Sequence, residues 1–429
     1  MLHHSVLLGV LAAGVAAMPA WGQQASGQHA FTLRRAVTLA VQNSPELALA
    51  KVRYNVAGRH TGLARSVFLP NLFTGVGGAY SKGFPLGAPS VFQLNYVQTL
   101  FNPPLRGELR AAQERERGEQ ASVDQARDAV IVRAAAAYLE LVKVRHTLRL
   151  LREEQGSAAQ VTGVTRERAG EGLELPIEVT RAELSEARVR QRVLQSESRE
   201  EWLESELRAL TGLGPGTALE VSEEELPAAA DLPAAELVGQ ALANHPALRA
   251  AEHERRAREH QWKGERGGYL PTIDVITQYA IFSRHNNYDD FYRNFERHNV
   301  TAGVTLRIPI FASQRAATVA LARSEFDAAG IELDQKRAEV ERSVRQQARL
   351  AREYEAARDV ARLELRLAQE NLRVTQARYD EGRANLRDLE KARLEEHDRW
   401  REFLDAEFDR QKARLELLRE TGQLSRLFP

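Results

Sequence analysis

The chain has 429 residues, and its 59 Lys and Arg residues balance its 59 Asp and Glu residues, so the formal net charge is zero at pH 7. A neutral chain has no overall electrostatic attraction to nucleic acid or acidic lipid, which disfavours a nucleic-acid-binding function. The absence of cysteine excludes disulfide bonds, thiolate zinc sites, a cysteine nucleophile and membrane attachment through an acylated cysteine.

Residues 1–22 have the pattern of a secretory signal peptide. An apolar run, Val6–Met18, is too short to span a bilayer, and Ala20–Gly22 places small residues at both positions that matter for cleavage. We therefore expect export, with the mature chain beginning near Gln23. No other uninterrupted apolar stretch reaches about 18 residues, so the sequence predicts no transmembrane helix. Any membrane-spanning part would consist of strands.

The mature chain is internally duplicated. Asn43-Ser44-Pro45 recurs as Asn244-His245-Pro246, and Phe68-Leu69-Pro70 recurs 201 positions later as Tyr269-Leu270-Pro271. Thr211-Gly212 recurs after 210 positions as Thr421-Gly422, so nine additional residues lie in the second half, most plausibly in the loop 284–299. The sequence therefore predicts two equivalent halves, residues 23–223 and 233–429, joined by a Pro- and Ala-rich linker at 224–232.

Each half is predicted to contain an opening helix, two strands, a long helix, a tight turn and a returning helix. Apolar residues recur at spacings of three and four from Val123 to Leu151, and again from Val340 to Leu372. We expect long helices at 105–169 and 313–380 and returning helices at 176–210 and 386–420. A helix of 65 residues at 1.5 Å per residue is about 100 Å long, so the molecule should be an elongated coiled coil.

Four segments alternate between apolar and polar residues, as β-strands do. They lie at about 71–81, 91–101, 272–282 and 299–310. Ten alternating residues allow a tilted strand to cross a bilayer, with apolar residues toward lipid and polar residues, including Asp274 and Arg307, toward a lumen. A half-buried soluble sheet would alternate in the same way, but export favours the membrane. Four strands cannot close a barrel, so oligomerisation is required, and a trimer leaves more room for a passage than a dimer.

Taken together, the motifs resemble the TolC-type outer-membrane efflux protein family over nearly all of the mature chain. The resemblance rests on the duplicated Asn-x-Pro segment, the Leu-Pro before the first strand of each half, the segment Leu306–Phe311, and two turns at 169–182 and 379–392. In each turn an acid follows a glycine by six residues. The resemblance implies a mainly helical protomer with four transmembrane strands, and a homotrimer with a twelve-stranded barrel in the outer membrane and a twelve-helix tunnel in the periplasm.

The resemblance also implies partners at the periplasmic tip. The two turns would contact a periplasmic adaptor, a membrane fusion protein, and through it an inner-membrane transporter. The residues expected at this contact are Gly172, Leu173, Gly382 and Arg383. A simpler interpretation is that the two glycines only permit tight turns. No cofactor is implied.

Three tip residues are expected to form the channel gate. The resemblance makes Tyr379 the tip tyrosine, Glu178 its acidic partner and Asp388 a member of a constricting acidic ring. Asp388 could instead simply begin the returning helix, where a carboxylate is favourable. The chain departs from the family pattern at Ala384, where some relatives have arginine, and at Lys391, where they have a second acid, although Arg383 and Arg387 lie near Ala384.

Other classes of protein fit the sequence less well than a channel. A periplasmic adaptor or another exported coiled-coil scaffold would also have helical hairpins, but has no need of two strand pairs of membrane-crossing length. An enzyme is disfavoured because the sequence has no Gly-rich phosphate loop, HExxH motif or serine nucleophile elbow. A metal site from His285, Asp289, Asp290 and His298 is less plausible than a solvated polar loop. Drugs, metal ions and secreted proteins all fit as cargo.

Overall fold

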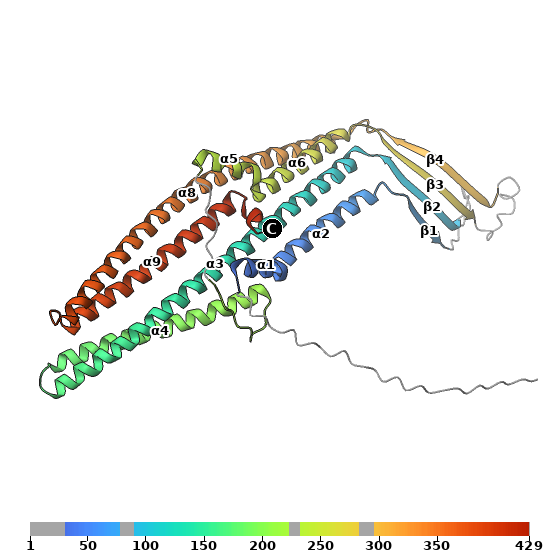
Figure 1. The fold of residues 1–429 in the computed structure, drawn as a ribbon. Coiled ribbons are helices and arrows are strands. Elements are labelled where there is room, and N and C mark those ends of the chain that lie inside the picture. Colours follow the sequence, from blue (N-terminus) through green and yellow to red (C-terminus); the bar gives the residue numbers. More distant parts are fainter. Residues whose placement is uncertain (1–30, 78–89, 223–231, 283–295, 429) are drawn as a thin grey trace, which may run out of the picture.

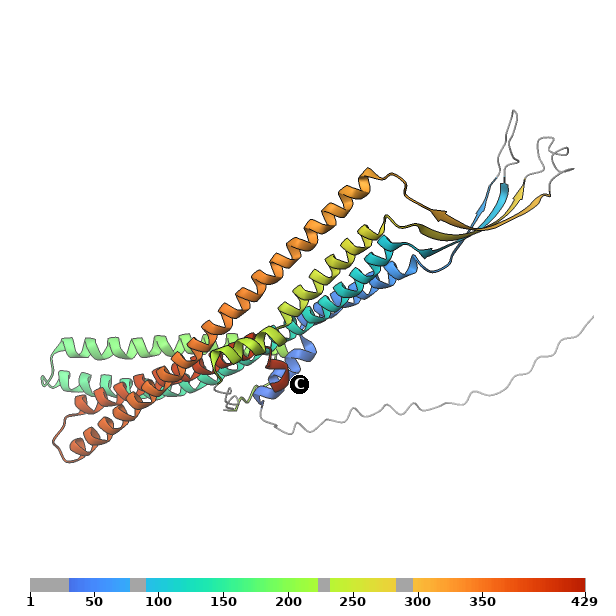
Figure 2. The same cartoon turned by 90° about the horizontal axis from the view of Figure 1, so that it is seen from above.

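The computed structural model describes residues 31–77, 90–222, 232–282 and 296–428. Over these ranges the chain is elongated, with a four-stranded sheet at one end and two helical hairpins toward the other (Figure 1). A second view shows that both hairpin turns lie at the same end, remote from the sheet (Figure 2). Among the described residues, no helix is both long and apolar enough to cross a membrane. The predicted signal peptide lies outside the described ranges, as does the predicted linker except Leu232.

The two halves contain the same series of elements. The first half comprises α1 (Leu33–Asn43), α2 (Pro45–Ser66), β1 (Asn71–Val76), β2 (Ser90–Phe101), α3 (Pro103–Gly170) and α4 (Pro176–Thr211). The second comprises α5 (Ala234–Asn244), α6 (Pro246–Gly267), β3 (Thr272–Phe282), β4 (His298–Arg307), α8 (Ser313–Asp380) and α9 (Leu386–Glu420), followed by α10 (Leu424–Leu427). The long helices α3 and α8 have 68 residues each, or about 100 Å at 1.5 Å per residue.

The opening helix expected in each half is in fact two helices. Ser44 and His245 have extended backbones because each precedes a proline, and the following proline begins the second helix. The side chain of Ser44 accepts the N–H of Leu47 at 3.3 Å, and Nδ1 of His245 accepts the N–H of Ala247 at 3.2 Å. Each Asn-x-Pro motif therefore ends one helix and caps the next.

Some element ends also differ from the expected ranges. β4 ends at Arg307 rather than at residue 310, because Pro309 has no N–H to donate to a neighbouring strand. α3 begins at Pro103 rather than at residue 105, because proline is tolerated in the first turn of a helix. β1 ends at Val76, and residues 78–81 of the predicted first strand lie outside the described ranges.

The strands form one antiparallel sheet in the order β1-β2-β3-β4, with β1 and β4 at its edges. The register gives the sheet two different faces. The apolar face carries Leu72, Phe92, Leu94, Tyr96, Val275, Tyr279, Ile281, Val300, Val304 and Leu306. The other face carries Gln93, Asn95, Thr99, Asp274, Gln278, Thr301, Thr305 and Arg307.

The alternation in β2 is irregular at one place. Gln98 lies in register with Val275 on the apolar face, whereas Val97 lies on the polar face opposite Ile276. Two hydrogen bonds satisfy Gln98: its Nε2 donates to the carbonyl oxygen of Phe68 at 3.3 Å, and the hydroxyl of Tyr96 donates to its Oε1 at 2.7 Å. The side-chain amide of Gln98 thus has hydrogen-bond partners for both its donor and its acceptor, near the end of β2 that adjoins the helices.

The duplicated motifs pack against each other in each half. Gly212 and Gly422 follow the returning helices with φ of 70° and 67°, a conformation that favours glycine. A Cβ on Gly212 would lie 2.9 Å from Cγ of Asn43, and one on Gly422 would lie 2.9 Å from the carbonyl oxygen of Asn244. The amide of Asn43 donates to the carbonyl of Thr211 at 2.6 Å. The amide of Asn244 instead donates to the carbonyl of Gln240 at 2.9 Å, so the second motif meets the end of its returning helix by close packing alone.

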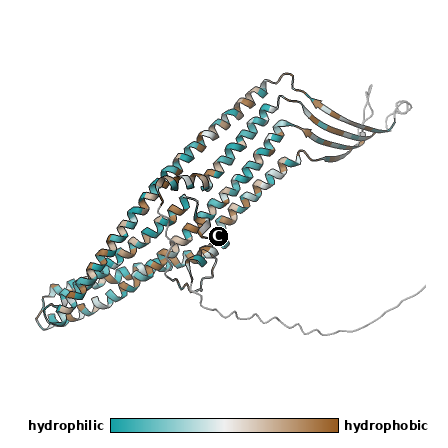
Figure 3. Cartoon of the chain, turned by 45° about the horizontal axis from the view of Figure 1, so that its top comes forward, coloured by the Kyte–Doolittle hydropathy of each residue, from teal (hydrophilic) through white to brown (hydrophobic). Residues whose placement is uncertain are grey.

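The main core lies midway along the molecule, where α3 meets the short helices. It contains residues of α1, the middle of α3, and the ends of α4 and α9. The fully buried Tyr138 places its hydroxyl 2.8 Å and 2.7 Å from the carbonyl oxygens of Phe31 and Ser222. Elsewhere hydrophobic and hydrophilic residues alternate along the helices (Figure 3), as expected for a wall of packed helices exposed on both sides.

Burial of Asp128 predicts a pH-dependent stability. Asp128 lies on α3, is 6% exposed, and borders cavities of about 320 and 420 Å³. Burial, reinforced by nearby Asp124, raises the pKa of Asp128 from 3.8 to about 6. Because the folded pKa is the higher one, the folded protein loses stability relative to the unfolded chain as the pH rises from about 4 to 6, by on the order of 2 to 3 kcal/mol.

We therefore expect Asp128→Asn to raise the melting temperature at pH 7.5 and to change it little at pH 4. The measurement is thermal unfolding of both proteins at each pH. Burial lowers the pKa of His245, so protonation of His245 destabilises the fold on acidification. That effect is shared by both proteins and cancels in the comparison. An equal change at both pH values would contradict the assignment to Asp128.

Candidate functional site

The hairpin turns have the same geometry. Gly172 follows α3 with φ of 77°, and Gly382 follows α8 with φ of 72°. The N–H of Leu173 donates to the carbonyl of Arg168 at 2.8 Å, and the N–H of Arg383 donates to that of Arg378 at 2.7 Å. A Cβ on either glycine would meet nothing within 4 Å, so the backbone conformation alone explains the glycines.

The two turns differ in surface chemistry. The first turn exposes apolar side chains, those of Leu173, Leu175 and Ile177. In the second turn, Arg383 and Arg387 are about four-fifths exposed, at 76% and 80%. The first turn therefore presents mainly exposed apolar side chains and the second mainly exposed arginines.

Asp388 lies in the first turn of the returning helix α9, whose N-cap residue is Asn385. The side chain of Asn385 accepts the N–H of Asp388 at 2.9 Å, and the carboxylate of Asp388 accepts the N–H of Asn385 at 3.4 Å. This reciprocal pair is a capping box. The carboxylate is otherwise exposed. Asp388 thus takes part in the capping box as the third residue of α9, with Asn385 as the N-cap residue.

Arg387 of α9 links Glu178 to the second turn. The sequence analysis did not predict this pair. Arg181 binds the carboxylate of Glu178 at 2.6 Å within the same helix, and Arg387 approaches it at 3.7 Å from α9. No hydrogen bond joins Glu178 to Tyr379 among the described residues, although Tyr379 is partly exposed at the same end. The positive charge near Glu178 from the second turn therefore comes from Arg387.

Asp274 and Arg307 lie on the same face of the sheet. The carboxylate of Asp274 accepts a hydrogen bond from the hydroxyl of Thr99 at 2.8 Å. Arg307 is opposite Thr272, two residues before Asp274 in β3. The polar face therefore carries both charges near the end of the sheet that adjoins the helices.

The two hairpins meet along an interface between α3 and α9, which we call the seam. The sequence analysis did not identify the charged residues of this seam. The carboxylate of Glu154, on α3, binds Arg192 of α4 and Arg401 of α9, each at 2.8 Å. Nearer the sheet, Lys143 binds Asp405 at 2.9 Å. The available signal was the register of Glu154, which follows Leu148 and Leu151 at the same spacing of three.

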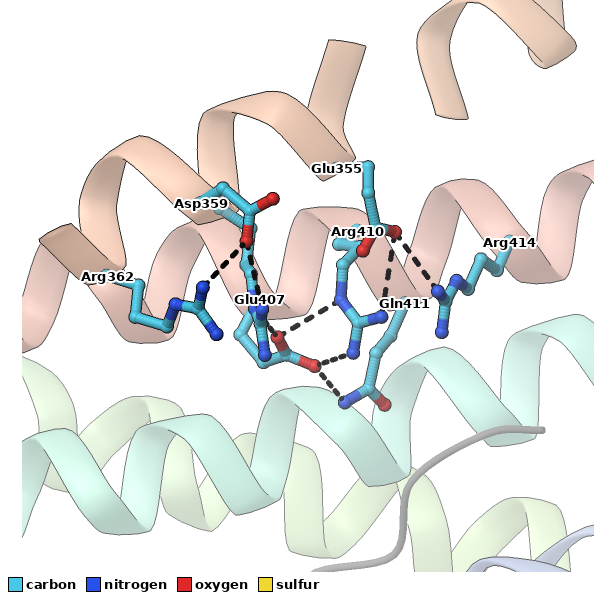
Figure 4. A network of polar contacts seen from close by, with 8 residues as sticks. Glu355, Asp359, Arg362, Glu407, Arg410, Gln411 and Arg414 are labelled. Atoms are coloured by element: carbon cyan, nitrogen blue, oxygen red, sulfur yellow. Dashed lines mark hydrogen bonds and ion pairs between the residues drawn. The ribbon is translucent and has the colours of Figure 1, made fainter. Parts of the chain in front are cut away.

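A cavity of about 500 Å³ opens along this seam. Its walls include Leu139 and Lys143 of α3 and Trp400 and Phe403 of α9. Beside it, an ionic network joins α8 and α9 (Figure 4). The residues labelled there are Glu355, Asp359, Arg362, Glu407, Arg410, Gln411 and Arg414.

Glu407 is the centre of that network. Its carboxylate accepts from Arg358 at 3.2 Å, from Gln411 at 2.8 Å and from Arg410. Burial raises the pKa of Glu407, but these three donors outweigh burial and hold the pKa below its usual value. The network therefore stays ionised near neutral pH and ties α9 to α8, within one hairpin.

The described residues contain no cluster of three or more His, Cys, Asp or Glu suited to a metal ion. Of the loop residues considered earlier, His285, Asp289 and Asp290 lie outside the described ranges. Nδ1 of His298, in β4, lies 2.7 Å from the hydroxyl of Tyr279 on the neighbouring strand. This contact gives His298 a structural partner within the sheet.

Comparison with known proteins gives consistent matches. Protein CyaE of Bordetella pertussis is 26% identical over 323 residues, which cover 72% of this chain and 66% of that protein, just under two thirds of its length. The Campylobacter jejuni CmeC outer membrane channel has a TM-score of 0.77 and 18% identity, covering 91% of this chain and 85% of that one. CusC has a TM-score of 0.76 and 16% identity, covering 91% and 92%.

A family model described as outer membrane efflux protein matches residues 36–213 and 237–423. These ranges cover most of both halves, including α3 with α4 and α8 with α9. The resemblance inferred from the duplicated motifs is thereby confirmed. The chain belongs to the outer membrane efflux protein family.

Proposed function

We propose that the chain is the exit duct of a tripartite efflux or type I secretion system, which passes substrates from an adaptor and inner-membrane pump to the exterior. The protein resides in the outer membrane, with a long helical part in the periplasm. One observation carries the proposal: a sheet with one apolar and one polar face, open at both edges, continues into helices about 100 Å long. A lipid-facing wall extended by a tunnel has this form.

The open edges support a trimer. β1 and β4 are the edge strands, and α2 and α8 are the outermost of the helices beneath the sheet (Figure 1). Unpaired edges are not tolerated in lipid, so β1 of one copy would pair with β4 of the next, and three copies would close twelve strands. Both outer helices expose apolar side chains for such a contact. They include Leu49, Val52, Val56 and Leu63 of α2, and Leu321 and Ile331 of α8.

The tip supports the expected partners. The exposed apolar turn around Gly172 and Leu173 and the basic turn around Gly382 and Arg383 would contact the adaptor. Tyr379, Glu178 and Asp388 would surround the axis, with Arg387 bridging to Glu178 across the two hairpins. At the other end, Asp274 and Arg307 would face the barrel lumen, with the apolar face of the sheet toward lipid.

The test is assembly and conductance of the purified full-length protein. We expect detergent to be needed for extraction from the outer membrane, a trimer by light scattering in detergent, and discrete ion-conducting events in planar bilayers. A salt wash that releases the protein as a monomer would instead favour an adaptor or an exported scaffold. A trimer that does not conduct would contradict the duct.

A further inference from the structure

The cavity along the seam has a lining that the proposed duct function does not use. Its volume is about 500 Å³, a size that suits a small molecule. Three aromatic side chains of α9 line it, those of Trp400, Phe403 and Phe408. The rings of Trp400 and Phe403 meet edge to face, with their centroids 5.8 Å apart. Leu139 and Val142 of α3 add aliphatic surface, so most of the lining is apolar.

The internal duplication shows that a returning helix does not need these aromatic residues. At the offset of 210 that relates the two returning helices, the three aromatic residues correspond to residues without a ring: Arg190, Val193 and Ser198. The helix α4 nevertheless packs along α3, as α9 packs along α8. Helix packing alone therefore does not explain the rings, and aromatic side chains at a cavity are typical of a ligand site.

One polar atom at this cavity lacks a partner. Gln411 is 9% exposed, and its Nε2 donates to Glu407 at 2.8 Å. Because an ionised carboxylate only accepts hydrogen bonds, the amide nitrogen must face Glu407 and the amide oxygen must face away (Figure 4). Among the described residues, Oε1 of Gln411 has no hydrogen-bond partner. A buried acceptor without a donor is unfavourable, so a ligand that brings an O–H or N–H to this atom gains affinity.

The charged groups at the cavity favour an anion. Lys143 and Arg358 each contribute a positive charge and Glu407 a negative one, so with His146 neutral the lining has an excess of positive charge. Arg358 is engaged by Glu407 at 3.2 Å. Lys143 is less committed, because its partner Asp405 is 63% exposed and water competes for that pair. The ammonium group of Lys143 has three donors and can therefore also bind an anionic group in the cavity.

We propose that this cavity binds an aromatic anion that also has a hydrogen-bond donor. The rings lie against Trp400 and Phe403, the donor bonds to Oε1 of Gln411, and the anionic group pairs with Lys143. From Trp400 to Gln411 the lining extends about 16 Å along α9 at 1.5 Å per residue, which leaves room for at least two fused rings with separate polar groups. The inference goes beyond the proposed duct function and does not depend on it.

The probe for the test is 6-hydroxy-2-naphthoate, which has two fused rings, a hydroxyl donor and a carboxylate. Equilibrium dialysis of the purified protein, with the same detergent in both chambers, should show saturable binding. The matched ligand 2-naphthoate lacks the hydroxyl and should bind about tenfold more weakly, because Oε1 of Gln411 then keeps no donor. Uptake that does not saturate, or equal binding of the two naphthoates, would overturn the proposal.

Substitutions assign the two polar contacts. Gln411→Met removes the acceptor, so it should abolish the difference between the two naphthoates and leave the binding of 2-naphthoate unchanged. A preference for the hydroxylated ligand that persists in Gln411→Met would contradict the assignment. Lys143→Met should weaken both ligands several-fold, because both have the carboxylate. If Gln411→Met does not fold, the comparison of the two ligands on the wild-type protein and on Lys143→Met still decides.

Two tryptophan variants test whether the rings bind in the cavity. Trp400→Leu should weaken both naphthoates several-fold. Trp202→Leu is the matched control, because Trp202 is 51% exposed on α4, outside the cavity lining, and has the guanidinium of Arg199 over its ring. It should bind both ligands as the wild type does. Equal losses in the two variants would show that the naphthoates bind any exposed ring beside a cation, and the proposal would then be wrong.

Discussion

Arginine in place of Val304 is expected to abolish assembly in the membrane, whereas arginine in place of the adjacent Thr305 is expected to be tolerated. Val304 lies on the apolar face of β4, in register with Val275, and its side chain is exposed. If this face contacts lipid, an arginine near the middle of the bilayer costs about 2–4 kcal/mol. A trimer would incur that cost three times.

Thr305 is the matched control, because it is adjacent to Val304 in β4 but lies on the opposite face of the sheet. It lies opposite Asp274 on the polar face, so an arginine there gains a carboxylate neighbour. The measurement is the amount of trimer in the outer-membrane fraction after mild extraction. Equal yields for the two variants would show that the sheet does not have one face in lipid.

Local patterning predicted the long elements well. α8 and α9 lie at Ser313–Asp380 and Leu386–Glu420, the ranges expected from an uninterrupted helical period ending at a glycine turn. Predictions for long periodic segments are reliable because many residues contribute to one pattern. The opening helix of each half was harder to predict. The Asn-x-Pro motif is compatible either with one kinked helix or with two separate helices, and the structure has two.

Residues that act across the seam could not be assigned from the sequence. Glu154 follows Leu148 and Leu151 at a spacing of three, which separates it from the exposed Glu153, but only tertiary packing shows which cations it binds. Likewise the sequence places Arg383 and Arg387 near Ala384, but only the packing of the two hairpins shows that Arg387 approaches Glu178. Partner choice between distant helices depends on their relative rotation, which a periodic pattern does not fix.

The tip and the seam use charge in the same way. Glu178 binds Arg181 within its hairpin and Arg387 across the seam, as Glu154 binds Arg192 and Arg401. The difference is burial, because Arg387 is 80% exposed and its contact is 3.7 Å long. Salt screens the tip contact more strongly than the buried one. The tip contact is therefore the weaker of the two at physiological salt.

Neutralising Asp388 is expected to reduce the preference of the channel for cations several-fold. In a trimer, three carboxylates around a narrow axis attract cations and repel one another. Asp388→Asn removes the charge but keeps a side-chain oxygen that can accept the N–H of Asn385, so the cap of α9 is retained. The measurement is reversal potential and single-channel conductance in a salt gradient.

Asn385→Ala is the complementary control for the capping box. It removes the side-chain oxygen that accepts the N–H of Asp388 and costs about 1 kcal/mol of helix stability, but it preserves the charge. Selectivity should therefore stay at the wild-type value. If Asn385→Ala alters selectivity while Asp388→Asn does not, the local conformation of the turn, rather than a ring of carboxylates, determines passage. Asp388 would then be a helix cap alone, and the electrostatic barrier would have to lie elsewhere along the tunnel.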